Sequence, residues 1–169
     1  QIKGTGRCCF ADPATTRIYP LPRHDARPIY HRALTIVTNA PDVATAVLGR
    51  PGFEVILLGG KLDPRIGGAI GSRTVRQAQD IRADLCFPGV CALDPASGLW
   101  TFDGEETVLK QALIEASGAT VVVATPDKLV ASATHHTAPI TALPHLVVTA
   151  DTESSMVERY RHAGVAGHL

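Results

Sequence analysis

Six short apolar runs are separated by longer stretches in which apolar residues recur with a helical period. Val, Ile and Leu dominate the runs, and their apolarity is continuous rather than alternating, which is typical of strands covered on both faces of a parallel sheet. The predicted strands span residues 7–11, 34–38, 53–58, 84–90, 119–124 and 145–150. This alternation predicts an α/β fold with a mainly parallel, Rossmann-like sheet and helices on both faces.

Four helices are predicted between the strands. Pro41 suits the first turn of a helix over residues 41–49, because its missing N–H would have no partner there. Capping residues and apolar spacing predict the others over residues 72–82, 105–117 and 152–162. Between the fourth strand and the third helix, the turn sequence DPASG predicts a small hairpin excursion within residues 91–104.

The composition fits one globular domain over residues 1–169, with 45% hydrophobic and 19% charged residues. Sixteen basic and sixteen acidic residues cancel, whereas a domain that grips nucleic acid is usually strongly basic. No apolar run reaches the roughly 20 residues needed to cross a bilayer. We therefore expect a cytoplasmic protein without membrane contact. Because the chain begins with Gln1, we also expect a piece of a longer protein.

No metal or cofactor is expected. The four cysteines match no zinc spacing and are interpreted as core thiols. His135 and His136 are adjacent, so they share no face of a strand or helix, and we expect them in a surface loop. Fingerprints of a P-loop, a dinucleotide site and a nucleophile elbow are absent from the sequence.

The loops after the strands carry residues suited to an anion. In open α/β sheets, ligands bind beyond the carboxyl ends of the strands. The five loops read DPATT, TNAP, GGKLDPRIGGAIG, PGVCALDP and TPDK. Their Gly, Thr, Asn and charged residues expose backbone N–H groups or offer a hydroxyl or a cation, so a phosphate group is the simplest common target.

Two of the four lysines fall at suggestive positions in this pattern. Lys110 lies four residues after Glu106, a spacing that also describes an ordinary solvated ion pair on a helix. Lys128 follows the fifth strand, where an exposed turn lysine is the alternative. The residues alone leave both alternatives open.

Seven segments agree in order and spacing with one known family. They read DPATT, LTIVTNAP, VILLGG, AIGSRTV, ADLCFPGVCALDPASGLWT, EETVLKQALIEAS and VVVATPDKL, over residues 10 to about 150. Together they resemble the C-terminal effector-sensing domain of DeoR-type transcriptional regulators. The resemblance implies the fold of ribose-5-phosphate isomerase, glucosamine-6-phosphate deaminase and coenzyme A transferases. It also implies a homo-oligomeric repressor that senses a phosphorylated sugar and binds DNA through a winged helix-turn-helix upstream of this chain.

The same resemblance implies the residues that surround the sugar phosphate. They are Asp12, Thr15, Thr16, Thr38, Asn39, Gly59, Gly60, Gly71, Asp84, Gly89, Glu106, Lys110 and Lys128. The glycines have an alternative role in backbone geometry, and Asp84 has one in capping a turn. Before Lys128, Thr125 stands where the family has an aspartate.

The first loop also departs from the family. Pro13 and Ala14 replace its flexible middle, and Pro20 and Pro22 would each cost about 3 kcal/mol inside a helix. We therefore expect no long helix over residues 17–33, and this phosphate subsite loses the favourable N-terminus of a helix.

A sensor domain without catalysis is the leading hypothesis, in which effector binding changes the affinity of the regulator for DNA. One alternative is a sugar-phosphate isomerase or deaminase, with Glu106 as general base and Lys110 or Lys128 stabilising negative charge. The other is an oligomerisation module that binds no ligand.

Overall fold

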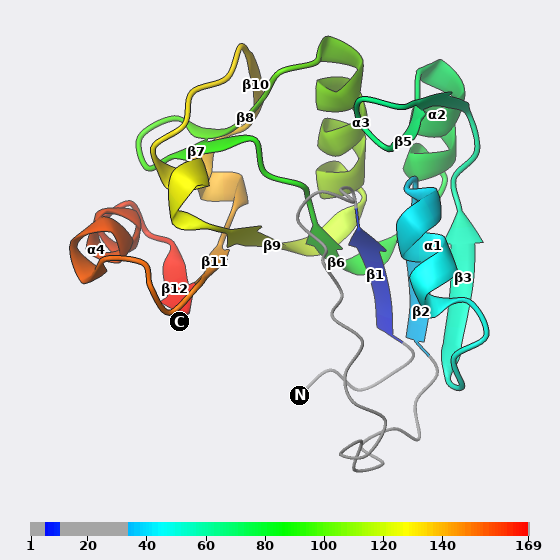
Figure 1. Ribbon diagram of the computed structural model, residues 1–169, viewed down its shortest axis with the longest axis horizontal. Coiled ribbons are helices and arrows are strands. Elements are labelled where there is room, and N and C mark those ends of the chain that lie inside the picture. The colour runs from blue at the N-terminus through cyan, green and yellow to red at the C-terminus, as the bar shows by residue number, and fades with distance from the viewer. Residues whose placement is uncertain (1–5, 11–33, 169) are drawn as a thin grey trace.

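A single parallel sheet forms the centre of the domain in the computed structural model, which describes residues 6–10 and 34–168. Its seven strands follow the order β12-β11-β9-β6-β1-β2-β3, and every pair is parallel (Figure 1). The strands are β1 (Gly6–Phe10), β2 (Leu34–Thr38), β3 (Phe53–Leu57), β6 (Ala83–Phe87), β9 (Ser117–Ala124), β11 (His145–Val148) and β12 (Ala166–His168). The predicted parallel sheet is confirmed, and β12 is an addition to it.

The four predicted helices are all present in the described residues. They are α1 (Pro41–Val47), α2 (Ser72–Gln79), α3 (Gly104–Glu115) and α4 (Ser154–His162). Two short 3-10 turns, η1 (Pro126–Leu129) and η2 (Ile140–Ala142), lie between α3 and α4. α1 begins with its proline, and α3 begins after Asp103, whose carboxylate accepts hydrogen bonds from the backbone N–H groups of Glu105 and Glu106. In the described ranges, no helix has the length and apolarity to cross a membrane.

Helices cover both faces of the sheet, as predicted. Successive residues of β2 point to opposite sides: Ile36 packs with Val43 and Val47 of α1, whereas Val37 packs with residues of α2 and α3. This double burial explains why the strands read as continuous apolar runs. Residues 17–33, for which we predicted no long helix, lie outside the described part of the chain.

Two small antiparallel sheets interrupt the alternation of strands and helices. The predicted hairpin is formed by β7 (Ala92–Asp94) and β8 (Gly98–Thr101), and β10 (His135–Ala138) pairs with β8 as a third strand. The expected surface loop at His135 and His136 is therefore wrong, because both lie in β10, although their side chains are exposed. The second sheet, β4 (Lys61–Asp63) and β5 (Gly68–Ile70), was not predicted.

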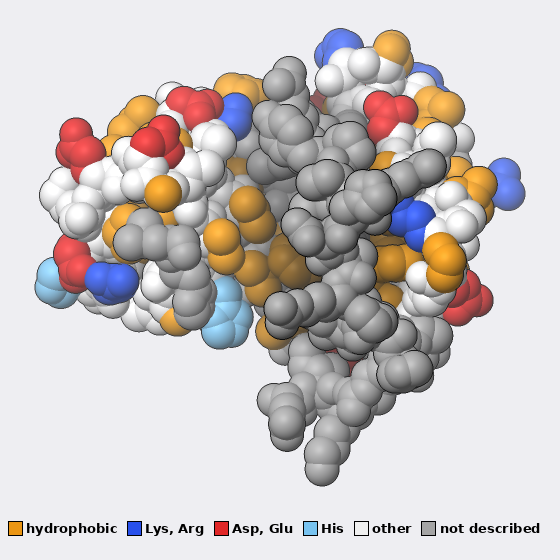
Figure 2. All heavy atoms as spheres, turned by 60° about the horizontal axis from the view of Figure 1, so that its bottom comes forward, with side chains coloured by type: hydrophobic (Ala, Val, Ile, Leu, Met, Phe, Trp, Pro, Cys, Tyr) orange, Lys and Arg blue, Asp and Glu red, His pale blue; other side chains and the backbone are white. Residues whose placement is uncertain are grey.

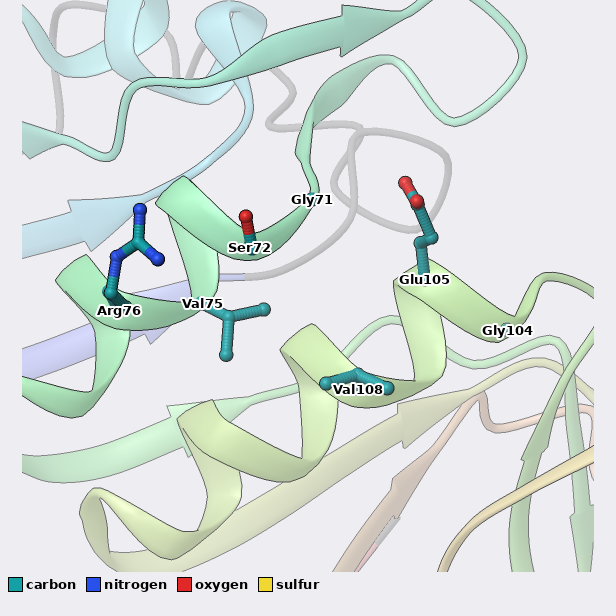
Figure 3. Close-up of a pocket in the computed structure, with 7 residues that line it drawn as sticks. All are labelled: Gly71, Ser72, Val75, Arg76, Gly104, Glu105 and Val108. Atoms are coloured by element: carbon teal, nitrogen blue, oxygen red, sulfur yellow. The ribbon is translucent and has the colours of Figure 1, made fainter.

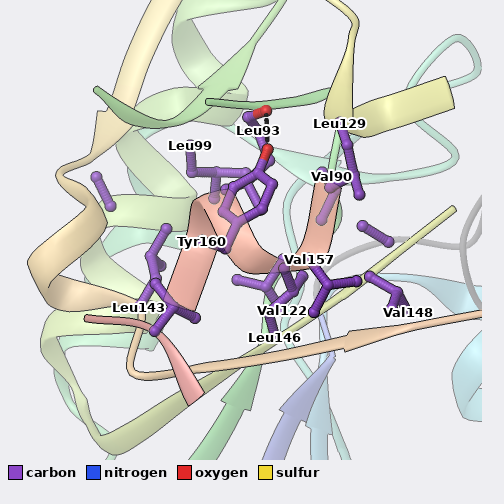
Figure 4. Close-up of a cluster of buried hydrophobic side chains, with 13 residues drawn as sticks. Val90, Leu93, Leu99, Val122, Leu129, Leu143, Leu146, Val148, Val157 and Tyr160 are labelled. Atoms are coloured by element: carbon purple, nitrogen blue, oxygen red, sulfur yellow. Dashed lines mark hydrogen bonds between the residues drawn. The ribbon is translucent and has the colours of Figure 1, made fainter. Parts of the chain in front are cut away.

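A buried cluster fixes the hairpin to the C-terminal part of the chain. Tyr160 of α4 is 1% exposed and donates a hydrogen bond from its hydroxyl to the carbonyl oxygen of Leu93 at 2.7 Å (Figure 4). Burial, and then the charge of Asp94, raise the pKa of Tyr160 to about 12. Leu99 and Val157 pack in the same cluster, so α4 and the hairpin share one core.

Candidate functional site

The carboxyl ends of the strands meet at one edge of the sheet. Thr38 lies beside Phe10 of β1 and Leu57 of β3, and Phe10 lies beside Phe87 of β6. α3 also begins at this edge, because it leads into the start of β9 from the hairpin that follows β6 (Figure 1). The topology therefore gathers the loops in which the sequence placed its ligand residues.

Thr38 ends β2, Asn39 follows it, and both are buried. The Thr38 hydroxyl accepts a hydrogen bond from the N–H of Ala40 at 3.1 Å. The Asn39 side-chain amide donates to the carbonyl oxygen of Ala69 at 3.0 Å, and the Asn39 carbonyl accepts from the N–H of Ala69 at 2.8 Å. Asn39 thus fixes the β4–β5 hairpin to the sheet, and its Oδ1 is buried without a hydrogen-bond partner among the described residues.

Gly59 and Gly60 lie in the turn after β3, and side chains of α2 hold this turn. Gln77 accepts from the N–H of Gly59 at 3.1 Å and donates to its carbonyl at 2.8 Å, and the Thr74 hydroxyl donates to the same carbonyl at 3.1 Å. A Cβ atom on Gly60 would lie 2.1 Å from that hydroxyl. The close approach of the Thr74 side chain is therefore sufficient reason for Gly60 to be a glycine.

Gly71 precedes α2 with a φ of 93°, a conformation that favours glycine. No side chain caps α2, whereas Asp103 caps α3. A cavity of about 340 Å³ lies between the beginnings of the two helices, with Val75 and Val108 facing each other and Arg76 and Glu105 at its sides (Figure 3). Of the predicted ligand residues that the structure describes, only Gly71 lines this cavity. A second cavity, of about 400 Å³, is lined by Thr35 of β2 and Glu54 of β3. It therefore lies towards the amino ends of these two strands.

Glu106 and Lys110 form an ion pair inside the protein. Lys110 Nζ lies 2.6 Å from Glu106 Oε1, and the side chains are 1% and 11% exposed, respectively. Helical spacing puts both on the face that buries Leu109 and Leu113 against the sheet. Because long helical side chains extend towards the helix N-terminus, the ammonium extends towards the edge where the strands end. In the described structure it makes no hydrogen bond of regular geometry.

Lys128 lies in η1, after β9, in a different environment. Its side chain is 37% exposed, and its Nζ lies 3.4 Å from Oδ2 of the exposed Asp127. The Thr125 hydroxyl donates to the same carboxylate. This hydrogen bond, and after it Lys128, lower the pKa of Asp127.

The remaining predicted ligand residues fall into three groups. Gly89 is buried in the loop after β6, at the same edge of the sheet. Asp84 is exposed near the start of β6, at the opposite end of that strand, so the structure does not bring it together with the others. Asp12, Thr15 and Thr16 lie outside the described residues.

Three charged residues at this edge were not among the predicted ones. Arg65 NH2 lies 2.8 Å from Oδ2 of Asp63 and 3.6 Å from Oδ2 of Asp103, and thereby connects the β4–β5 turn to the beginning of α3. The hydrogen bond from Arg65 is the main cause that lowers the pKa of Asp63 to about 2. Asp103 could have been predicted as the N-cap of α3, because the spacing D-x-x-E at residues 103–106 is typical of a helix start.

Comparison with known proteins identifies the family of this chain. The model of the DeoR C terminal sensor domain matches residues 5–150. The chain belongs to the DeoR sensor-domain family. The fold and family predicted from the seven segments are therefore confirmed, and the DeoR match includes the strand ends, the Glu106–Lys110 pair and Lys128.

Several curated relatives of this DeoR sensor domain carry the names of transcriptional repressors. The glycerol-3-phosphate regulon repressor of Escherichia coli K12 is 36% identical over 98 residues, which cover 58% of this chain and 39% of that repressor. The putative aga operon transcriptional repressor of Escherichia coli O157:H7 is 27% identical over 80% of this chain and 50% of its own length. The HTH-type transcriptional repressor CsqR of Escherichia coli K12 is 32% identical over 65% and 42%, respectively. The matched parts span half or less of these relatives.

Proposed function

We propose that this domain binds a small phosphorylated sugar or polyol at the carboxyl ends of the strands, without turning it over. The observation that carries the proposal is the buried ammonium of Lys110, which has only Glu106 as a partner in the described structure. An ammonium has three donors, so a ligand oxygen would supply an acceptor that is otherwise missing. The name of the glycerol-3-phosphate regulon repressor supports a phosphate ester as the ligand class.

The phosphate and the hydroxyl groups of such a ligand also have residues suited to bind them. Lys128 is exposed enough to meet a phosphate from solvent, and a charge-assisted hydrogen bond to it would add affinity. The uncapped N–H groups at the start of α2 are a second set of donors for an anion. The unpaired Oδ1 of Asn39 is an acceptor suited to a sugar or polyol hydroxyl.

In the proposed role, ligand binding changes the DNA affinity of a winged helix-turn-helix upstream of this chain. Coupling of this kind requires that the ligand bind one arrangement of the regulator better than the other. The repressor names of the relatives support the role. The ion pair with Lys110 speaks against Glu106 as the general base of an isomerase, since it stabilises the carboxylate and occupies one of its oxygens.

Titration calorimetry with a panel of ligands tests the proposal. The panel contains glycerol 3-phosphate, ribose 5-phosphate, glucosamine 6-phosphate, inorganic phosphate and glycerol. We expect one phosphate ester to bind more tightly than both inorganic phosphate and glycerol, and to be recovered unchanged after incubation. Equal weak binding of every anion would contradict a specific site. Isomerised or deaminated product that disappears in Glu106→Gln would instead establish an enzyme.

A further inference from the structure

The outer edge of β3 has free backbone groups in the described structure. Within β3 and its flanks, Gly52 accepts from the N–H of Leu34, and Leu58 donates to the carbonyl of Thr38, each at 2.8 Å. Because backbone groups alternate sides along a strand, the N–H and C=O groups of Phe53, Val55 and Leu57 point away from β2. The N–H of Phe53 is bonded to Arg50 in the preceding turn. Val55 and Leu57 keep both groups available at this edge.

Apolar side chains are concentrated around the same edge. Nine large apolar side chains of the described residues are exposed, and five of them lie between residues 48 and 62. They are Leu48, Phe53, Ile56, Leu57 and Leu62, with exposed fractions of 39 to 74%. Apolar side chains are visible at this end of the molecule, where α1 and β3 lie (Figures 1 and 2).

The usual protection of an edge strand is missing from β3. Natural edges carry lysine, proline or a bulge that prevents another strand from pairing. β3 contains neither lysine nor proline, and its pairing with β2 is regular. Its only charged residue, Glu54, accepts a hydrogen bond from the Thr35 hydroxyl of β2 at 3.0 Å, which holds the carboxylate back over the sheet.

The free groups and apolar residues of β3 are symmetric about Val55. We propose that β3 pairs antiparallel with β3 of a second copy of this chain, around a twofold axis at Val55. The two Val55 residues then exchange N–H and C=O bonds, and Leu57 of each copy donates to the carbonyl of Phe53 in the other. The bond from Phe53 to Arg50 remains intact. Leu48 and Leu62, both exposed, lie in the segments that precede and follow β3.

A second copy fits this edge because the side chains of β3 are complementary to those of an antiparallel β3. Phe53 of one copy lies opposite Leu57 of the other, so apolar side chains meet on the face that α1 covers. No like charges oppose each other in the register, since Glu54 lies opposite Ile56. A twofold interface of this kind is closed, which limits the assembly through this edge to a dimer.

Sedimentation velocity of the complete chain and its variants tests the pairing. We expect a species of twice 17.8 kDa for the natural sequence. Val55→Pro should give a monomer, because it removes a donor at the free edge and no hydrogen bond to β2. Val130→Lys, at an exposed apolar residue outside this edge, is the matched control and should stay dimeric.

A charge exchange tests the register. Phe53→Lys and Leu57→Glu should each weaken the dimer, whereas the double variant should restore it, because each introduced lysine then lies opposite an introduced glutamate. Circular dichroism verifies that every variant is folded. A chain that is monomeric at all concentrations would overturn the proposal and leave this edge for another segment or protein. A dimer that persists in Val55→Pro would also overturn it. So would a double variant that dimerises no better than the single variants.

Discussion

The two lysine–carboxylate pairs at the strand ends have the same chemistry in opposite surroundings. Lys110 and Glu106 are buried and 2.6 Å apart, whereas Lys128 and Asp127 are 37% and 68% exposed and 3.4 Å apart. Buried ions have lost their hydration and depend on each other, while water and salt screen an exposed pair. The comparison indicates that Lys110 keeps Glu106 as a fixed partner and offers a ligand only its remaining donors, whereas Lys128 can exchange its partner for a ligand.

The largest expected effect follows the loss of Lys110. Lys110→Met leaves the Glu106 carboxylate buried without a partner, which should lower the free energy of unfolding by about 3–5 kcal/mol. Urea denaturation measures it. Glu106→Leu combined with Lys110→Met should recover most of the loss, because both charges are then absent. Lys61→Met, at an exposed lysine, is the control. The comparison fails if Lys110→Met lowers the free energy of unfolding no more than Lys61→Met does.

Lys128→Ala should affect binding rather than folding. A charge-assisted hydrogen bond contributes about 1.5–3 kcal/mol, so affinity for the tightest phosphate ester of the panel should fall about tenfold to a hundredfold. The free energy of unfolding should change by less than about 0.5 kcal/mol. Arg161→Ala is the matched control, since Arg161 belongs to an exposed pair with Glu158 on α4. Unchanged affinity would make Lys128 an ordinary turn lysine.

Asp127→Asn should have a smaller effect of the opposite sign. Exposed pairs contribute about 0.2–1 kcal/mol, and the lysine that is released becomes available to the ligand. We expect affinity to rise about two- to fivefold, with the increase reduced at high salt. Calorimetry at two salt concentrations measures both effects. A loss of affinity would show that Asp127 itself supports the ligand.

The smallest expected effect is a change in the titration of Asp127. Thr125 and Lys128 lower its pKa in the folded state, so the stability that this carboxylate contributes is present above its unfolded value of 3.8 and is lost as the pH falls through the folded value. Thr125→Val should raise the folded pKa more than Lys128→Ala does, because the Thr125 hydrogen bond is the larger cause. Carboxyl NMR titration of the three proteins checks the order.

Continuous apolar runs predicted the central sheet well, because double burial leaves a strong signal in sequence. The missed elements lack that signal. β12 is three residues long and includes Gly167, and β4 and β5 lie in a loop rich in glycine. β10 begins with two exposed histidines, and its pairing with β8 depends on residues more than thirty positions away.

The candidate site was predictable as a set of loops but less so as an arrangement of side chains. The i,i+4 spacing predicted the contact between Glu106 and Lys110, yet spacing contains no information about what covers the pair. Asp84 lies at the start of β6, and a motif that spans a strand does not indicate which of its residues lie at the carboxyl end. The packing role of Gly60 depends on Thr74 of α2, fourteen positions away, and no local pattern indicates that contact.

The hydrogen bond between Tyr160 and Leu93 joins residues 67 positions apart, and this has a consequence for synthesis on the ribosome. The DeoR family match ends at residue 150, but Val157, Tyr160 and Val165 complete the core around the hairpin. A nascent chain therefore exposes Leu93 and Leu99 until Val157, Tyr160 and Val165 have left the exit tunnel. Messages cut short after the codon for Ala150 would produce a chain with an open core, which proteases and chaperones recognise.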